Sequence, residues 1–415
     1  MASRRGERRR WFAIRGIVEY AACSRQWYSC PALCCSQSNI RYAAAAPFLF
    51  RATHTTFSWT TGSNSALKTS ASELIAGIFV MQRKSTIEID KSPASVQHLP
   101  RSTKLHGLEG IAFSSSGNII AVAASHANAI LLFRQKANGQ FDSAPYGSIS
   151  GPESRLKYPH DVSFAPSANG ELLAVAQRGG SIAIFHQGEG SESYGSAPIF
   201  EIRGPKTGLQ FSDGVAFVPP NNDHLAACNL ETGTITFYRM TSAAPVRFSL
   251  EPVSKLQHKS LANPDGLAFS RCGRWLAVAS HGNHSVSIFK RRNRMFPGRK
   301  LMYGPKPVTI IKDPRLRYPH SVAFMPETNH LVVTNAGANH FSVYAPTKGV
   351  LGVGWSQSPL VEETVGPDDA FSDVNSRNEM EGGPKGIAIH QTRLAICGPV
   401  HGIKIYSFRE LLSVA

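Results

Sequence analysis

Six ionisable side chains recur at one position of a sequence repeat. In each copy, the residue lies two places ahead of an aliphatic residue in a short apolar run. Titratable groups gathered in this way are typical of sites for cation binding or acid–base chemistry. The six residues of this column are Glu109, His160, Asp213, Asp265, His320 and Lys385.

Two kinds of chemistry fit the column if its side chains meet around a channel. Chain order would make Lys385 and Glu109 neighbours, whose opposite charges neutralise each other. The other four residues form an arc of two carboxylates between two imidazoles, with no ammonium group among them. Such oxygen and nitrogen donors suit a divalent cation, Ca²⁺ or another. The same arc also fits two His–Asp dyads for general acid–base catalysis.

These possibilities assign candidate roles. Asp213, Asp265 and Glu109 are the candidate metal ligands, and His160 and His320 are the candidate catalytic residues that move protons. Loops between the second and third apolar runs of each repeat should open on the same face and bind a ligand. With the Lys385 and Glu109 pair, the candidate ligand-binding residues are His126, Arg178, Asn229, His281, His284, Asn335, His340 and His401.

A purely structural interpretation also fits the column. Tyr158-Pro159-His160-Asp161 is good turn chemistry, because proline fixes φ and aspartate tolerates unusual backbone angles. Structural charge networks also resemble sites. Both interpretations remain open at this point.

The repeat predicts the elements that carry the column. Its copies, aligned on Phe113, Phe164, Phe217, Phe269, Phe324 and Ile389, are 51 to 65 residues apart. Each holds three short strand-like runs separated by Gly, Asn, Ser and Pro, and a weaker fourth run such as Ile199–Arg203. An array of four-stranded antiparallel units without helices indicates an all-β fold with radially arranged blades.

The last repeat lacks its fourth strand. A matching segment, Thr86–Asp90, precedes the first repeat and can close the ring against the last blade, which removes an exposed sheet edge. We therefore predict a six-bladed β-propeller over residues 81–412, with first strands near 108, 159, 212, 264, 319 and 384.

Residues 1–80 lie outside the repeat. They are rich in Arg and poor in acids, and they hold Cys23, Cys30, Cys34 and Cys35 without metal or disulfide spacing. A disordered tail, an organelle transit peptide, a nucleic-acid contact through Arg4 to Arg10, and translation from Met81 all remain open. The compartment does not follow from the sequence.

Composition and charge restrict the classes of partner that we expect for this chain. The chain is 42% hydrophobic and has no run of 18 apolar residues, which predicts a soluble protein without a membrane span. The net charge is +16, and the densest basic stretch of the repeats, Lys290 to Arg294, lacks the interleaved aromatic residues of a nucleic-acid platform. We expect a monomer that binds a small molecule or protein at its channel face, and no nucleic acid.

The fourth repeat resembles the NHL and YVTN-type repeats of β-propellers. Its residues Pro264 to Phe269, Leu276 to Ala279 and Val286 to Phe289 carry the likeness, which extends over all six copies. The resemblance implies the fold and not one function. It therefore leaves a binding scaffold and an enzyme open.

More distantly, the chain is similar to the gluconolactonase and senescence-marker-protein family. Glu109-Gly110 and Pro264-Asp265-Gly266 match entries that hold a divalent metal in that family, and Asp213-Gly214 lies where it often has Asn-Gly. Ile111 stands where that family has proline, and the two histidines have no ligand role there. The resemblance implies a metal-dependent lactonase or related hydrolase as the alternative to a ligand- or partner-binding module.

One further segment is singled out by its charge. Residues 362–381 hold seven acids and lengthen the step before the last repeat. A lid or partner-binding loop over the channel and a solvated insertion both fit.

Overall fold

The chain forms a six-bladed β-propeller. In the computed structural model, the described residues are 56–59, 67–70, 83–92, 96–99, 107–191, 193–292, 302–349, 352–365, 380 and 382–414. Contacts divide the chain into two units, residues 1–81 and 82–415. The first unit contains the strand pair β1 (Thr56–Trp59) and β2 (Leu67–Ser70). No helix among the described residues is long and apolar enough to cross a membrane.

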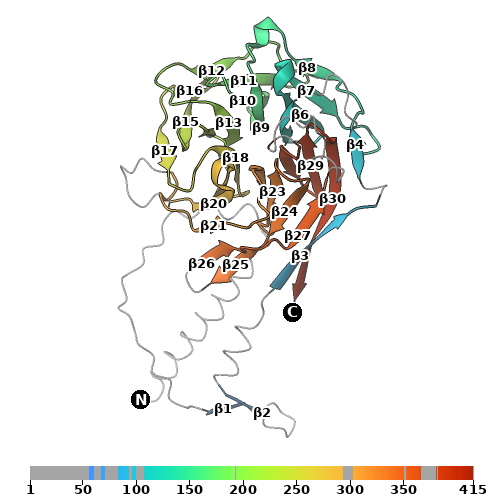
Figure 1. The fold of residues 1–415 in the computed structure, drawn as a ribbon, viewed down its shortest axis with the longest axis vertical. Helices are drawn as coiled ribbons and strands as arrows, with labels where there is room; N and C mark the ends of the chain where they lie inside the picture. Colours follow the sequence, from blue (N-terminus) through green and yellow to red (C-terminus); the bar gives the residue numbers. More distant parts are fainter. Residues whose placement is uncertain are drawn as a thin grey trace, which may run out of the picture. The chain divides into compact units, whose positions relative to one another are not determined.

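Each blade is a four-stranded antiparallel sheet, and in blades 1 to 5 the strands follow one another outward from the channel in chain order (Figure 1). Alternating or continuous runs of Val, Ile, Ala and Phe form the inner three strands. The β-branched and aromatic residues among them favour the β-strand conformation. The first three blades are β5 (Leu108–Phe113), β6 (Ile119–Ala124), β7 (Ala129–Arg134) and β8 (Gly147–Ile149); β9 (Pro159–Ser167), β10 (Gly170–Gln177), β11 (Ser181–Gly188) and β12 (Phe200–Arg203); and β13 (Ser212–Phe217), β14 (His224–Asn229), β15 (Thr234–Ala243) and β17 (Ser254–Gln257).

The second half of the ring repeats this plan. Blade 3 also carries the short strand β16 (Val246–Phe248) beside β15, and blade 5 carries an inserted hairpin of β25 (Pro346–Gly349) and β26 (Gly352–Trp355). The remaining strands are β18 (Pro264–Phe269), β19 (Trp275–Ser280), β20 (Ser285–Lys290) and β21 (Thr309–Ile311); β22 (Pro319–Phe324), β23 (Leu331–Asn335), β24 (His340–Tyr344) and β27 (Val361–Thr364); and β28 (Ile387–His390), β29 (Arg393–Gly398) and β30 (Gly402–Val414).

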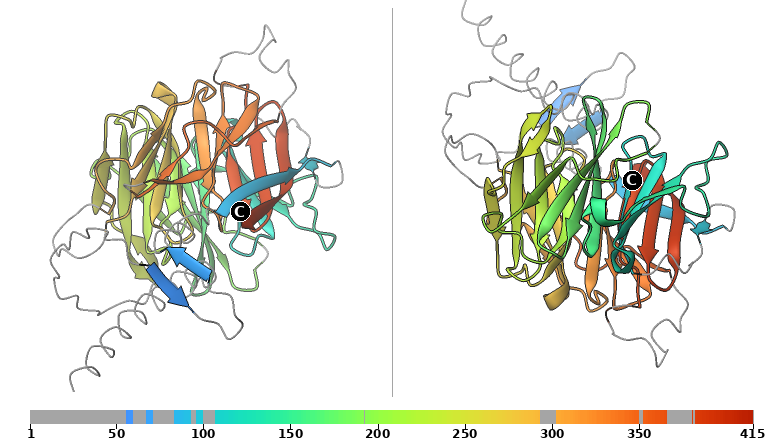
Figure 2. Two further views of the ribbon diagram at one scale, coloured as in Figure 1. Left: turned by 90° about the horizontal axis from the view of Figure 1, so that it is seen from below. Right: turned by 90° about the horizontal axis from the view of Figure 1, so that it is seen from above.

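The ring closes as the sequence predicts. Strand β3 (Arg83–Asp90) pairs antiparallel with β30, with Ile89 opposite Phe408, and supplies the fourth strand of blade 6 (Figure 2). The short strand β4 (Gln97–Leu99) also pairs with β30, which the sequence did not indicate. The innermost strands contact one another around the channel in the order β5, β9, β13, β18, β22, β28 and back to β5.

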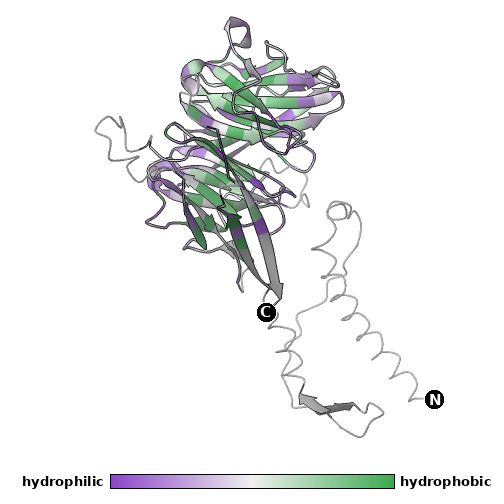
Figure 3. Ribbon diagram, turned by 90° about the vertical axis from the view of Figure 1, so that its right-hand side faces the viewer, coloured by the Kyte–Doolittle hydropathy of each residue, from purple (hydrophilic) through white to green (hydrophobic). Residues whose placement is uncertain are grey.

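The core lies between the blades. Six buried apolar clusters fill the six interfaces between adjacent blades, and the green strand interiors of Figure 3 show the same concentration of hydrophobic residues. Ile87 and Ile89 of the closing strand join the cluster between blades 5 and 6. Burial of this apolar area is the main force that holds the inner strands, and their side chains, around the channel.

The structure describes part of each of two charged stretches, and it corrects the interpretation of the acidic one. Glu362 and Glu363 lie on β27, so they belong to the outer strand of blade 5 and not to a loop; residues 366–379 of the predicted insertion lie outside the described residues. Of the basic stretch after β20, Arg291 donates a hydrogen bond from Nη1 to the Pro219 carbonyl at 2.8 Å, and residues 293–301 also lie outside the described residues.

Candidate functional site

The ionisable column lies where the innermost strands depart from regular pairing. In blade 1 the register of β5 against β6 shifts between Leu108 and Ile111, so that Glu109 and Gly110 fall in the irregular stretch. Blades 3, 4 and 5 show the same shift, and blade 2 has one beside His160. A bulge of this kind re-aims one side chain. It explains how one residue of each of these strands turns toward the channel.

Glycine follows the ionisable residue in four blades because the next inner strand lies close. A Cβ at Gly266 would lie 2.5 Å from the His320 carbonyl oxygen, and one at Gly214 would lie 2.5 Å from that of Asp265. In blades 2 and 5 the same position holds Asp161 and Ser321. Asp161 uses Oδ2 to accept a hydrogen bond from the Val215 backbone amide at 3.0 Å.

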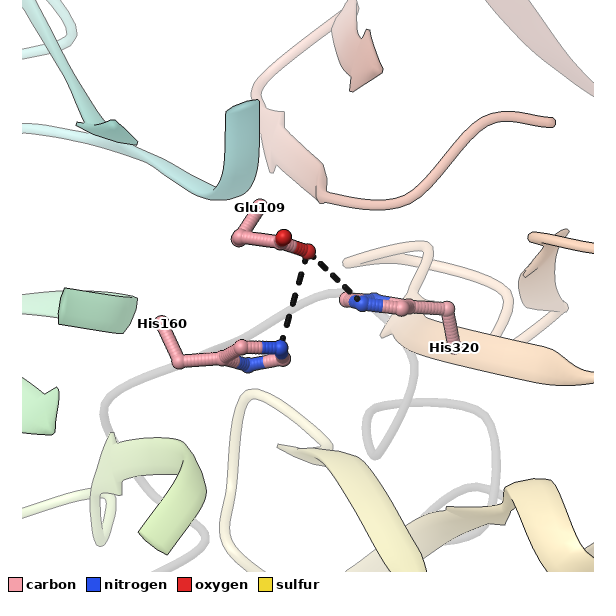
Figure 4. Close-up of side chains that lie close together, drawn as sticks. All are labelled: Glu109, His160 and His320. Carbon is pink, nitrogen blue, oxygen red and sulfur yellow. Dashed lines mark ion pairs between the residues drawn. The ribbon is translucent and has the colours of Figure 1, made fainter. Parts of the chain in front are cut away.

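The structure brings all six residues of the column together in a buried central ring. None of their side chains is more than about one twentieth exposed: Glu109 5%, His160 1%, Asp213 0%, Asp265 3%, His320 5% and Lys385 4%. Figure 4 shows Glu109 facing both imidazoles, with Oε2 at 3.5 Å from His160 Nε2 and 3.3 Å from His320 Nε2. The two imidazoles stack with ring centroids 5.1 Å apart.

Two of the three ring carboxylates are clamped by cations. Lys385 Nζ donates to both Glu109 oxygens, at 3.0 and 2.8 Å. Burial opposes ionisation of Glu109, but Lys385 and the nearby imidazoles hold its pKa well below the usual value. Glu109 is therefore ionised at neutral pH.

Arg178 is a cation that the sequence analysis did not place in the arc. Its Nε and Nη2 donate to the Asp213 oxygens at 2.8 and 3.3 Å, and Nη2 also lies 2.8 Å from His160 Nε2. Since guanidinium only donates, His160 Nε2 accepts. Burial and the positive charge of Arg178 lower the pKa of His160 to about 3, so this imidazole is neutral.

Asp265 has no Lys or Arg partner in the described site. His281 Nδ1 and His320 Nε2 lie 3.4 and 3.7 Å from its Oδ2, and His160 Nδ1 lies 3.8 Å from Oδ1. These separations exceed good hydrogen-bond lengths. Although burial opposes ionisation, the surrounding imidazoles lower the pKa of Asp265. Burial and the Asp265 charge instead raise the pKa of Asp213, against the pull of Arg178.

Asp161 is a fourth carboxylate at this centre and was missed by the sequence analysis. It follows His160 directly and occupies the position that is glycine in four other blades. Burial raises its pKa to about 7, with hydrogen bonds from Val215 and Val162 opposing that rise. The alignment of the six repeats does single out Asp161, because it is an acid at a position that is glycine in four repeats.

Two groups of donor atoms lie close enough to hold a metal. In each group the atoms lie within 4.8 Å of one another, in Glu109, His160 and His320 and in His160, Asp213 and Asp265. The first includes the carboxylate clamped by Lys385, and the second includes the one clamped by Arg178. A metal in either group would compete with a cation already in contact with its ligands.

The candidate ligand-binding residues of the loops differ in their contacts and exposure. Asn229 and Asn335 accept hydrogen bonds through Oδ1 from the backbone amides of Gln210 and Arg317, both at 3.2 Å, so their side chains join loops. His126 is exposed. His340 Nε2 lies 3.8 Å from Glu362, and burial lowers the pKa of His401, in the β29–β30 turn, to about 3.

A repeated hydrogen bond places these loops on one face. The residue before the inner strand accepts, through its carbonyl, a hydrogen bond from the first residue after the second strand. The pairs are Gly107 and Ser125, Tyr158 and Arg178, Phe211 and Leu230, Asn263 and His281, and Tyr318 and Ala336.

All five accepting residues adopt a positive φ, between 48° and 65°. Glycine and asparagine tolerate this left-handed conformation, but it is unusual for bulky residues such as Tyr158, Phe211 and Tyr318. Tyr158 is 58% exposed and Phe211 is 38% exposed. These aromatic residues were not among the predicted site residues, although Tyr-Pro-His stands in both blade 2 and blade 5.

We define the channel rim as Tyr158, Arg178, Phe211, His281, His284 and Tyr318. The Arg178 guanidinium carbon lies 5.1 Å from the Phe211 ring centroid. The Tyr318 ring lies 4.9 Å from that of His281 and 4.5 Å from that of His284. His281 also reaches Asp265, and Arg178 reaches Asp213, so the rim contacts the central ring at two points.

The similarity of the chain to known proteins is confined to solved structures. No protein-family model matches the chain, and no curated protein sequence does. Among solved structures, the chain is similar to the Swd1 β-propeller domain from Myceliophteria thermophila, at 15% identity and a TM-score of 0.46 over 72% of this chain and 83% of that one. It is also similar to a putative 6-phosphogluconolactonase from Bacteroides uniformis, at 14% identity and a TM-score of 0.46 over 72% and 80%.

Proposed function

We propose that the protein is a ligand- or partner-binding module that uses the channel rim. The observation that carries this proposal is the set of three aromatic residues, Tyr158, Phe211 and Tyr318, held in a left-handed conformation that glycine would adopt without strain. Backbone strain of this kind costs about 1 to 3 kcal/mol per residue and is concentrated at binding sites.

The rim offers defined chemistry to a ligand. Arg178 is about one-third exposed, and its Nη1 makes no hydrogen bond to a described residue. Beside it stands the exposed ring of Phe211. A flat apolar or aromatic group that also presents a hydrogen-bond acceptor fits this pair, because the ring supplies contact area and the guanidinium supplies directed donors.

The buried ring supports the rim and need not contact the ligand itself. Arg178 is fixed by Asp213 and His160, so its free edge is oriented before a ligand arrives. Binding then costs little side-chain entropy. Glu109 and Lys385 bind each other and are proposed to stabilise the ring.

A paired capture experiment tests the proposal. Immobilised wild-type protein and the Phe211→Ala and Tyr158→Ala variants are exposed to the same metabolite and peptide mixtures, and retained species are identified by mass spectrometry. Leu250→Ala, at a residue that is 49% exposed between β16 and β17, is the matched control. We expect a species retained by wild type and control but at least tenfold less by the rim variants. Identical retention by all four proteins would overturn the proposal.

A metal-dependent lactonase or related hydrolase is the second candidate. The two groups of carboxylate and imidazole donors favour it, as does the resemblance of Glu109-Gly110 and Pro264-Asp265-Gly266 to a lactonase family. In this function Glu109, Asp213 and Asp265 would hold the cation, and His160 or His320 would transfer protons.

Hydrolysis assays separate the two candidates. Wild type and the Asp213→Ala/Asp265→Ala double variant are assayed on a panel of aldonolactones with Ca²⁺, Zn²⁺ or Mn²⁺. Metal-dependent turnover lost in the double variant would support the hydrolase. Absence of turnover with every ion, in a folded wild-type protein, would reject it.

A further inference from the structure

Blades 2 and 5 share a motif that the other blades do not need in order to fold. Residues 155–160 read Arg-Leu-Lys-Tyr-Pro-His, and residues 315–320 read Arg-Leu-Arg-Tyr-Pro-His. The corresponding residues of blade 3, 208–213, and of blade 4, 260–265, share with both copies only the leucine, which is buried in all four. Packing of the blades therefore accounts for the leucine but not for the cation and the tyrosine.

The two motifs stand in opposite blades and are held in the same way. The Tyr158 amide donates to Asn128 Oδ1 at 2.7 Å, and the Tyr318 amide donates to His284 Nδ1 at 3.0 Å. Asn128 and His284 each end a 3₁₀ turn of the preceding blade, with φ of 47° and 50°. The channel mouth thus carries two equivalent half-sites, which we define as Lys157 with Tyr158 and Arg317 with Tyr318.

The cation of each half-site is presented on a fixed backbone. The Lys157 amide donates to Gln177 Oε1 at 2.6 Å, and the Arg317 amide donates to Asn335 Oδ1 at 3.2 Å. Both residues are exposed, and neither forms an ion pair with a described residue. A cation held in this way is available to a ligand at little cost in backbone entropy.

The loops that carry the half-sites are basic as a group. Residues 150–158, 204–211, 258–263 and 312–318 connect the outer strand of one blade to the inner strand of the next, and they hold seven Lys and Arg against two acids. Arg155 and Arg315 have acidic partners at 3.1 and 2.6 Å, whereas the half-site cations do not. Such an excess of exposed positive charge attracts an anionic ligand and repels a cationic one.

The separation of the half-sites sets the size of the ligand. The ring centroids of His160 and His320 are 5.1 Å apart, and each half-site tyrosine lies two residues before its histidine. At about 3.3 Å per residue, the two tyrosines are on the order of 15 Å apart. A small dicarboxylate is too short to reach both, but an extended peptide of about five residues is long enough.

The aromatic faces of the rim favour a peptide over a nucleic acid. His281 and His284 lie against Tyr318, with ring centroids 4.9 and 4.5 Å from its own. The Arg178 guanidinium carbon lies 5.1 Å from the Phe211 centroid. Single-stranded nucleic acid stacks successive bases on open aromatic faces, and these two rings already have neighbours against them. Carboxylates need cationic and hydroxyl donors instead, which both half-sites supply.

We propose that the channel rim binds an acidic peptide whose carboxylates bridge the two half-sites. This inference rests on the binding function proposed above and assigns its partner. Arg178, whose amide donates to the Tyr158 carbonyl, offers its free Nη1 to a further carboxylate of the same peptide.

Fluorescence polarisation with two labelled peptides of equal charge tests the bridging. Both have eight residues, four of them glutamate among glycine and serine; the glutamates are divided between the two ends in one and gathered at one end in the other. We expect the full chain to bind the divided peptide at least fivefold more tightly. Lys157→Gln or Arg317→Gln should abolish this preference, because either change leaves one half-site.

A matched variant controls for net charge. Lys306→Gln removes the same charge from an exposed residue between β20 and β21, at the other end of the strands, and it should keep the preference. Equal binding of the two peptides by wild type, or an equal loss in Lys306→Gln, would show attraction to the net charge of +16 alone and overturn the proposal. Tighter binding of a thymidine oligonucleotide of equal charge would also overturn it.

The capture experiment separates this inference from the binding function on which it rests. A retained species that depends on Phe211 but not on Lys157 or Arg317 would overturn the acidic peptide and leave the rim as a binding site. Retention that is identical in every variant would overturn both. Retained acidic peptides that are lost in Lys157→Gln and Arg317→Gln would support both.

Discussion

His160 and His320 stack across the channel with an angle of 24° between their rings. They come from blades 2 and 5, which stand opposite each other in the ring. The residues of the opposed blades 1 and 4, Glu109 and Asp265, each lie within 4 Å of both imidazoles. These four side chains at the centre of the propeller are thus arranged with approximate two-fold symmetry.

Removing one partner of the Lys385–Glu109 pair should destabilise the protein more than removing the charges of both. Lys385→Met leaves a buried carboxylate without its cation, and we expect the free energy of unfolding in urea to fall by about 3 to 5 kcal/mol. Adding Glu109→Gln should recover most of this loss, because the unpaired charge is removed. A double variant as unstable as Lys385→Met would show that the effect does not come from the buried charge.

The close approach of the inner strands predicts a contrast between two glycines. Gly266→Ala places a methyl group 2.5 Å from the His320 carbonyl oxygen and 2.7 Å from the Ser321 Cα, and overpacking against backbone costs about 1 to 3 kcal/mol or more. Gly147→Ala, with no atom within 4 Å of the new Cβ, should change stability little. Urea midpoints compare the two, and equal midpoints would contradict the packing argument.

The closing strand should define the minimal propeller. A chain that starts at Met81 retains β3, and we expect it to melt cooperatively like the full chain. A chain that starts at residue 93 lacks Ile87 and Ile89 of the core between blades 5 and 6 and exposes the edge of β30, so it should aggregate. Light scattering and melting curves measure both, and a soluble, cooperatively melting shorter chain would show that β3 is dispensable.

His330 predicts a loss of stability in acid. It is fully buried beside Thr328, and burial lowers its pKa to about 4. Between pH 6.5 and 4 the unfolded chain takes up a proton there that the native state does not, so stability falls as the pH falls through this range. The melting temperature should drop less between pH 7 and 4.5 in His330→Asn. An unchanged slope would assign the acid sensitivity to other groups.

The fold could be predicted because its signal is repeated. The apolar runs occur six times, and Thr86–Asp90 is the missing partner of a sheet whose other strands are visible in the sequence. The six residues of the central ring could be predicted from the sequence because they too recur once in each repeat. The last strand of blade 5 was harder to predict from the sequence. Glu362 and Glu363 look like part of an acidic loop there, but strand pairing places them on β27.

The site was only partly predictable because its details depend on side-chain geometry. Nothing in the spacing of Arg178 shows that it folds back onto Asp213 and His160. Asn229 and Asn335 have the polarity of ligand-binding residues, yet backbone amides occupy their oxygens. Asp161 stands in the column next to the ionisable one, where four of the other five repeats have glycine, so its place in the repeat does not by itself mark it as part of the site.

The pairing of β3 with β30 has a consequence for synthesis on the ribosome. Asp90 meets Ser407, so the first strand of the propeller to be translated must wait for the last one. At about 5 to 20 residues per second, the interval is roughly a quarter of a minute to a minute. Five blades can form while the nascent chain grows, but the sixth can be completed only at the end of translation.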